Sequence, residues 1–133
     1  EADREENIRR IGEVAALFAE AGVILIAAFI SPYREGRQRA RRAAGEGRFL
    51  EVHLDAPLET CEERDPKQLY RKARAGEIRG FTGIDAPYEA PEEADLVLDT
   101  AAIGLQECVE RIVARLIDLG VLPASREQEG ETS

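Results

Sequence analysis

The sequence is poor in the residues that most often carry metal and redox chemistry, with one histidine and two cysteines in 133 residues. Cys61 and Cys108 have no CxxC spacing and no histidine beside them. We therefore expect small buried thiols in a reducing compartment, and we assign no residue to a metal. His53 falls within an expected strand, which favours a structural role. No apolar run is long enough to span a membrane and no signal peptide opens the chain, which predicts a cytoplasmic protein without a membrane partner.

Lysine is also scarce, and its placement excludes one phosphate-binding motif from these residues. Lys67 and Lys72 are the only two lysines, and each follows a residue other than glycine. A phosphate-cradling loop of the form GxxxxGK[ST] needs a lysine directly after a glycine. The 133 residues therefore contain no such loop.

Charge is abundant but unevenly spread. The net charge of −9 argues against general nucleic-acid binding, and a content of 44% hydrophobic and 34% charged residues indicates one globular domain. Residues 31–81 nevertheless carry twelve basic and nine acidic side chains, between flanks of net charge −3 and −9. This basic island would attract an anionic ligand. A solvated helix face is an equally good interpretation.

Hydrophobic periodicity predicts helices alternating with strands. A long helix fills residues 1–22, and the continuous apolar run at 23–30 predicts a strand buried on both faces. Helix 103–119 has an inward stripe that includes Leu105, Cys108, Val109 and Val113. The other expected helices cover 34–44, 57–63 and 67–75, the other strands 49–55 and 95–100, and the polar end 123–133 is expected to be a disordered tail.

This order of elements predicts the α/β class, with a parallel sheet and helices on both faces. Three strands make a thin sheet, and the first helix has no strand before it. A right-handed crossover normally joins two strands through each helix. Residues 1–122 are therefore expected to form the later, carboxy-terminal part of a doubly wound domain.

Residues 76–89, GEIRGFTGIDAPYE, form a long segment without apolar periodicity. Two glycines flank Phe81 and Thr82, and Asp85 follows. Long ordered loops in compact domains usually act as lids or binding loops, so we expect a lid at about 76–90. Cations precede it, and an aromatic ring beside cations suits an anionic ligand with a flat base, such as a nucleotide. The cations are Arg64, Lys67, Arg71, Lys72, Arg74 and Arg79.

Ligands of open α/β sheets bind beyond the carboxyl ends of the strands, which directs attention to Ser31, Asp55 and Asp99. Pro32 is expected to hold Ser31 extended. The Ser31 hydroxyl would bind a substrate or accept a phosphoryl group, although a simple turn residue is the more economical interpretation. For Asp55, a helix cap is favoured over a metal-binding role.

Two pairs of side chains near helix ends offer further anion contacts. Pro66 breaks the chain between two helices. Arg64 and Lys67 would therefore project near the start of the lid and clamp phosphates. An exposed ion-pair cluster is the alternative. Arg4 and Asn7 share a face at the start of the first helix, where anions are attracted, but Arg4 would equally pair with nearby acids.

Four stretches together resemble the adenylylsulfate kinase (APS kinase) family of P-loop kinases: DREENIRR, FISPY, DAPLETCEERDPKQLYRKARAGEIRGFTGIDAPYEAP and DLVLDT. The resemblance covers nearly the whole chain, and KARAGEIRGFTGID is its most specific part. It implies a reaction in which ATP phosphorylates the ribose 3′-hydroxyl of adenosine 5′-phosphosulfate (APS) to give 3′-phosphoadenylyl sulfate, with Mg²⁺ bridging the ATP phosphates.

The resemblance also implies site residues. Ser31 matches the position described as a phosphoserine in the family and is the catalytic candidate, although direct in-line transfer needs no covalent step. Phe81 would stack on adenine, and Arg64 would lie on the ATP side of the lid. The substrate-binding residues implied are Arg4, Asn7, Ile30, Ser31, Lys67, Gly80 and Phe81.

One departure from the family is large, because the amino-terminal part that carries the Walker A loop has no counterpart in these residues. We expect a truncated form of a full kinase, inactive by itself, and the alternative is a non-catalytic phosphosulfate-binding or regulatory module. The resemblance further implies a homodimer, a fusion to or association with ATP sulfurylase, and no nucleic-acid partner.

Overall fold

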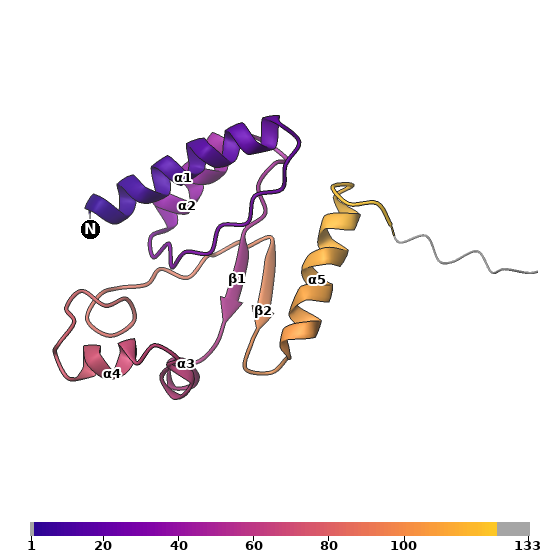
Figure 1. Ribbon diagram of the computed structural model, residues 1–133. Coiled ribbons are helices and arrows are strands. Elements are labelled where there is room, and N and C mark those ends of the chain that lie inside the picture. Colours follow the sequence, from indigo (N-terminus) through magenta and orange to yellow (C-terminus); the bar gives the residue numbers. More distant parts are fainter. Residues whose placement is uncertain (1, 125–133) are drawn as a thin grey trace, which may run out of the picture.

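Two short parallel strands organise the fold of the computed structural model, which describes residues 2–124 (Figure 1). β1 (Val52–Asp55) pairs with β2 (Leu96–Asp99) from Val52 opposite Leu96 to Asp55 opposite Asp99. Leu98 in β2 is fully buried. The chain between the two strands runs through helices, as parallel pairing requires. The predicted α/β class with a parallel sheet is therefore confirmed.

Five helices surround this pair within residues 2–124. The first and last residues of each helix differ from the predicted ones by at most two positions. In Figure 1, α1 and α2 lie together on one side of β1, and α5 runs beside β2. Gly22, with a φ of 75°, follows the end of α1 as predicted. The helices are α1 (Ala2–Glu20), α2 (Arg34–Ala44), α3 (Leu58–Arg64), α4 (Leu69–Arg74) and α5 (Leu105–Asp118).

The prediction of a strand at residues 23–30 is wrong. The segment is not part of the sheet, and its apolar side chains are open to solvent, with Ile26 90% and Ile30 62% exposed. A strand buried on both faces needs neighbouring strands that accept its backbone hydrogen bonds. Among the described residues β1 and β2 pair with each other, and the run at 23–30 pairs with neither of them.

The stripe predicted on α5 is only partly correct. Cys108 is buried, as expected, but Leu105 is 82% exposed and Val109 is 46% exposed. Spacing predicts which side chains share a helix face, whereas burial also requires a partner for that face. Cys61, the second predicted buried thiol, is only half-buried on α3.

α1 and α2 cross closely because small residues meet at the crossing. A methyl group on Gly12 would lie 3.1 Å from the Ala40 Cα and 3.5 Å from the Cβ atoms of Ala40 and Ala43. Gly36 of α2 lies against Ile8, but a methyl group there would keep 3.7 Å from the Ile8 side chain. The strongly polar α2 thus gains contact with α1 mainly through glycine and alanine.

Within residues 2–124 no helix is both long and apolar enough to cross a membrane. The expected disordered tail lies almost wholly outside the described residues, which end at Ala124.

The helix crossing predicts a difference between two otherwise equal substitutions in the full-length protein. Gly36→Ala adds a methyl group at an ordinary contact distance and gains up to about 0.5–1 kcal/mol of helix stability. Gly12→Ala has the same gain, but its methyl group presses on the Ala40 backbone. We therefore expect its free energy of unfolding to be lower than that of Gly36→Ala by at least about 1 kcal/mol. Urea unfolding of both variants measures the difference, and equal stabilisation would contradict the close crossing.

Candidate functional site

The segment between α1 and α2, residues 23–33 and here named the strap, carries Ile30 and Ser31. Ser31 has a φ of 42°, in the left-handed region, so the expectation that Pro32 keeps it extended is wrong. The turn is held from outside. The Arg37 guanidinium donates to the Ser31 carbonyl oxygen at 2.6 Å, and the Glu89 amide donates to the Pro32 carbonyl oxygen at 2.8 Å.

The tip of the lid, residues 76–90, closes on itself around one carboxylate. Asp85 accepts hydrogen bonds from the amides of Gly80 at 2.7 Å and Phe81 at 2.5 Å. The Phe81 carbonyl oxygen in turn accepts from the Ile84, Asp85 and Ala86 amides, each at 3.1 Å. A side chain that binds two successive amides fixes the backbone there, so the direction of Phe81 is set by Asp85.

Phe81 lies against α4 rather than in open solvent. Its ring meets the Tyr70 ring edge to face, with centroids 5.0 Å apart. Asp65 caps α4 by accepting from the Tyr70 and Arg71 amides, which orders the helix that carries Tyr70. Burial and the nearby Cys61 raise the pKa of Tyr70, so its hydroxyl stays protonated at neutral pH.

The carboxy-terminal end of the lid, at Glu89 and Ala90 and here named the root, is bonded to α2 and the strap. Glu89 accepts the Arg34 amide on its carboxylate at 2.8 Å and the Arg37 guanidinium on its carbonyl oxygen at 2.7 Å. The Arg34 side chain donates to the Ala90 carbonyl oxygen at 2.8 Å and pairs with Glu92 at 2.9 Å. The lid and the strap, about fifty residues apart in the chain, therefore share one set of hydrogen bonds.

Tyr88 connects the same end of the lid to β1. Its ring stacks on His53 with centroids 6.1 Å apart, and its hydroxyl lies 3.3 Å from the His53 Nδ1. Burial raises the pKa of Tyr88. His53 thus makes a packing contact within the sheet region, in agreement with the structural role expected of it.

The carboxyl ends of the strands are occupied by local contacts. Asp99 accepts the Ala101 and Ala102 amides at 3.0 Å. Arg64 donates to the Thr100 carbonyl oxygen at 2.7 Å, so its guanidinium lies at the end of β2. Asp55 does not cap α3, whose first turn has no side-chain cap, so the favoured interpretation of Asp55 was wrong. Its carboxylate instead lies 3.9 Å from the His53 Nε2.

The structure brings Ser31 to the root of the lid, and it leaves other predicted site residues on open surface. Ile30 and Lys67 are exposed on the strap and on the α3–α4 connection. Asn7 is exposed on α1, where Arg4 also lies, although the Arg4 side chain is outside the described part. The assignment of these residues to a substrate stays a prediction.

A partly buried charge network that the sequence did not indicate supports the strap and the lid. Glu51, directly before β1, lies 2.7 Å from the Arg37 Nε and 3.5 Å from Arg41. The Arg37 contact is an ion pair without hydrogen-bond alignment, which leaves the Glu51 Oε1 buried without a hydrogen bond. Arg41 also binds Asp95, directly before β2, at 2.5 Å, and Asp95 accepts the Glu51 amide at 2.7 Å.

This network shifts the ionisation of Asp95 and Arg41. Burial alone would raise the pKa of Asp95, but the hydrogen bonds from Arg41 and from the Glu51 amide outweigh it and hold that pKa below its usual value. The same hydrogen bond to Asp95 raises the pKa of Arg41. Both groups are therefore charged at neutral pH.

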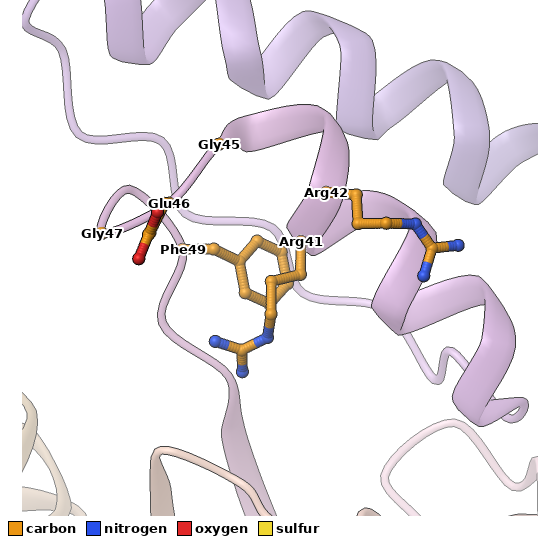
Figure 2. Close-up of a pocket in the computed structure, with 6 residues that line it drawn as sticks. All are labelled: Arg41, Arg42, Gly45, Glu46, Gly47 and Phe49. Atoms are coloured by element: carbon orange, nitrogen blue, oxygen red, sulfur yellow. The ribbon is translucent and has the colours of Figure 1, made fainter.

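A hollow lies elsewhere, at the end of α2 (Figure 2). It is an open depression of about 410 Å³ lined by Arg41, Arg42, Phe49 and the glycine-rich turn between them. In Figure 2 the Arg41 side chain lies along the Phe49 ring, with its guanidinium carbon 4.9 Å from the ring centroid. The hollow adjoins the amino end of β1, away from the lid tip. Arg41 is already paired with Glu51 and Asp95, so we do not place the substrate there.

Two observations concern the residues that were considered for ATP and for a metal ion. No three His, Cys, Asp or Glu side chains of residues 2–124 come together as metal ligands. Arg64, the ATP contact implied by resemblance, is bound to Thr100.

Comparisons with known proteins agree with the resemblance. The family model described as adenylylsulphate kinase matches residues 1–99. An adenylyl-sulfate kinase of Staphylococcus carnosus is 56% identical over 120 residues, which are 90% of this chain and 60% of the relative. One of Prochlorococcus marinus is 54% identical over 122 residues, 92% of this chain and 61% of the relative. The chain thus spans about 60% of the length of these curated relatives.

A solved structure gives the same answer for the fold. The Mycobacterium tuberculosis APS kinase CysC, in complex with AMPPNP and APS, matches with a TM-score of 0.81 and 45% identity, over 86% of this chain and 67% of that one. The fold is that of the P-loop NTPases. The chain is a member of the adenylylsulfate kinase family.

The lowered pKa of Asp95 predicts how stability depends on pH. Because the pKa is lower in the folded state than the usual 3.8, the stabilisation is fully present above pH 3.8 and is lost as the pH falls through the folded-state pKa. In urea unfolding between pH 7 and pH 3, we expect the wild type to lose more stability than Asp95→Asn. Asp118→Asn, at the exposed end of α5, serves as the control and should follow the wild type. An identical pH profile for Asp95→Asn would contradict the network.

Proposed function

We propose that the protein containing this chain transfers the γ-phosphoryl group of ATP to the ribose 3′-hydroxyl of APS. The 3′-oxygen bonds to the γ-phosphorus, the bond from phosphorus to the β–γ bridging oxygen breaks, and the hydroxyl loses its proton. The products are ADP and 3′-phosphoadenylyl sulfate, an activated sulfate donor. In this proposal residues 1–122 are the carboxy-terminal portion of the kinase domain.

The observation that carries the proposal is the set of hydrogen bonds between the lid and the strap. The Glu89 amide binds the Pro32 carbonyl oxygen, and Arg37 binds the carbonyl oxygens of Ser31 and Glu89. Two segments with predicted APS contacts thus meet at one place. Membership of the adenylylsulfate kinase family supports APS as the ligand.

Each proposed contact matches a chemical feature of APS. The cations Arg4 and Lys67 suit the phosphosulfate group, to which Asn7 would donate a hydrogen bond. Ile30 and Gly80 give the sugar and base a surface close to the backbone, and the Phe81 ring suits the flat adenine. When the lid covers the substrate it excludes water, which limits hydrolysis of ATP.

Ser31 occupies a special position in this proposal. Its hydroxyl sits on a left-handed turn beside the lid root, where a bound ribose or phosphoryl group would reach it. We favour direct in-line transfer, in which positioning and charge neutralisation supply most of the catalysis. Ser31 then orients the substrate without becoming phosphorylated.

The remaining parts of the proposal rest on the family resemblance. ATP and Mg²⁺ are the cofactors when bound, and Arg64 is the ATP contact, released from Thr100. Residues 1–133 alone lack a GxxxxGK[ST] loop and would be inactive by themselves. The proposal also includes a homodimer, a link to ATP sulfurylase and a cytoplasmic location. The two free thiols suit that location.

The activity itself is tested on the full-length protein with ATP, Mg²⁺ and APS. We expect chromatography to show 3′-phosphoadenylyl sulfate and ADP in equal amounts, and no phosphorylated product when adenosine 5′-phosphate replaces APS. APS binding without product would indicate the alternative, a non-catalytic phosphosulfate-binding module. Absence of APS binding would exclude both functions.

The Phe81 ring is predicted to contribute to APS binding by stacking. Stacking of a base on an aromatic ring is worth about 1–3 kcal/mol, so Phe81→Ala should weaken APS binding roughly five- to a hundredfold in calorimetry. Phe81→Tyr keeps the ring and serves as the matched control, with affinity close to the wild type. Because Phe81 also contacts Tyr70, the melting temperature of both variants is measured in parallel. Unchanged APS affinity in Phe81→Ala would remove the stacking role.

A further inference from the structure

Arg37 joins three segments that are far apart in the sequence. Its guanidinium donates to the Ser31 carbonyl oxygen at 2.6 Å and to the Glu89 carbonyl oxygen at 2.7 Å, and its Nε lies 2.7 Å from the Glu51 carboxylate. The side chain is only 11% exposed. Strap, lid and β1 are therefore connected through one side chain.

The shape of the guanidinium explains why an arginine stands at this position. Its five N–H donors form a rigid planar fork, so one group can serve acceptors in three directions. The Tyr88 ring lies 5.9 Å from the guanidinium carbon and adds a cation–π contact from the lid. An ammonium group would keep the charge beside Glu51, but its single nitrogen cannot reach both carbonyl oxygens with the same geometry.

The strap needs such an external support. Ser31 adopts a positive φ, which is unfavourable for a residue with a Cβ and persists only where the surroundings over-determine it. The two contacts that fix this turn are the Arg37 hydrogen bond at Ser31 and the Glu89 amide at Pro32. Both involve the end of the lid, because Arg37 also holds the Glu89 carbonyl oxygen.

We propose that Arg37 is a positioning residue that makes the strap and the root of the lid a single preformed unit for APS. This inference rests on the proposed function. Arg37 does not touch the substrate. It sets the turn that presents Ile30 and Ser31, and it fixes the point from which the lid closes. Its loss should therefore weaken APS binding more than it slows the bound substrate's reaction.

Two variants separate positioning from support of the fold. Arg37→Lys keeps a positive charge beside buried Glu51, whereas Arg37→Met leaves that carboxylate to the more distant Arg41. Arg39→Lys is the matched control, since Arg39 lies on the same helix, has a side chain that is 42% exposed, and pairs only with Glu35 of its own helix among the described residues. Melting temperatures should be close to the wild type for the Lys variants and lower for Arg37→Met.

The first measurement uses no ligand, so it is independent of the proposed function. Trypsin cuts after Arg79, which is exposed in the lid, at a rate that follows local opening. Mass spectrometry of the full-length protein should show this cut appearing several times faster in Arg37→Lys than in Arg39→Lys. If the wild type makes no product from APS, this comparison still tests the contact.

The second measurement is steady-state kinetics with APS and ATP. Hydrogen bonds to charged groups are worth enough to raise the KM for APS roughly tenfold or more in Arg37→Lys, with kcat changed less than about threefold. The KM for ATP should stay near the wild-type value.

Three results would overturn the inference. The first is wild-type kinetics and wild-type trypsin cleavage in Arg37→Lys, and the second is an equal effect in Arg39→Lys. The third is a fall in kcat and in melting temperature in Arg37→Lys with no selective change in the KM for APS, which would make Arg37 a support of the fold only.

Discussion

One partly buried carboxylate, that of Glu51, holds the two arginines on which the arrangement of the other elements depends. Arg37 and Arg41 both approach it, and the Glu51 backbone binds Asp95 at the start of the neighbouring strand. Removing one partner of a partly buried ion pair is expected to destabilise the fold, because the remaining charge is poorly solvated. Since α2 is polar and buries only Gly36 and Ala44, these charges attach it to the sheet where apolar packing does not.

The tip of the lid and its Glu89 end are attached to the rest of the fold in different ways. Its far end is bonded to α2 and the strap through Glu89, and Tyr88 rests on His53 of β1. Its tip is organised by its own Asp85 and contacts α4 through Phe81 and Tyr70. A loop with a fixed root and a self-contained tip can close as a rigid flap, because its internal hydrogen bonds survive the movement. Such closure suits a kinase, which must keep water from the phosphoryl group.

Local signals in the sequence predicted much of this fold. Gly22 marked the end of α1, and the apolar and arginine-rich stretches located α1, α2 and α5 within two residues. Burial was less predictable, because it depends on partners that spacing does not reveal. The 23–30 run therefore stayed outside the sheet, and Leu105 of α5 stayed exposed. For the site, the family resemblance pointed to the strap and the lid. Arg37 was missed because it is one of sixteen arginines, and its contacts lie across the fold.

Hydrogen exchange of the lid amides, followed residue by residue in the full-length protein with and without APS, tests the fixed root most directly. The account predicts that the Glu89 amide, bonded to the Pro32 carbonyl oxygen, exchanges slowly before APS is added and changes little afterwards. The amides around Phe81, whose hydrogen bonds stay within the tip, should exchange faster than the Glu89 amide without APS and become slower when APS is added. A Glu89 amide that exchanges as fast as those of the tip, or a lid whose exchange APS leaves unchanged, would contradict the account.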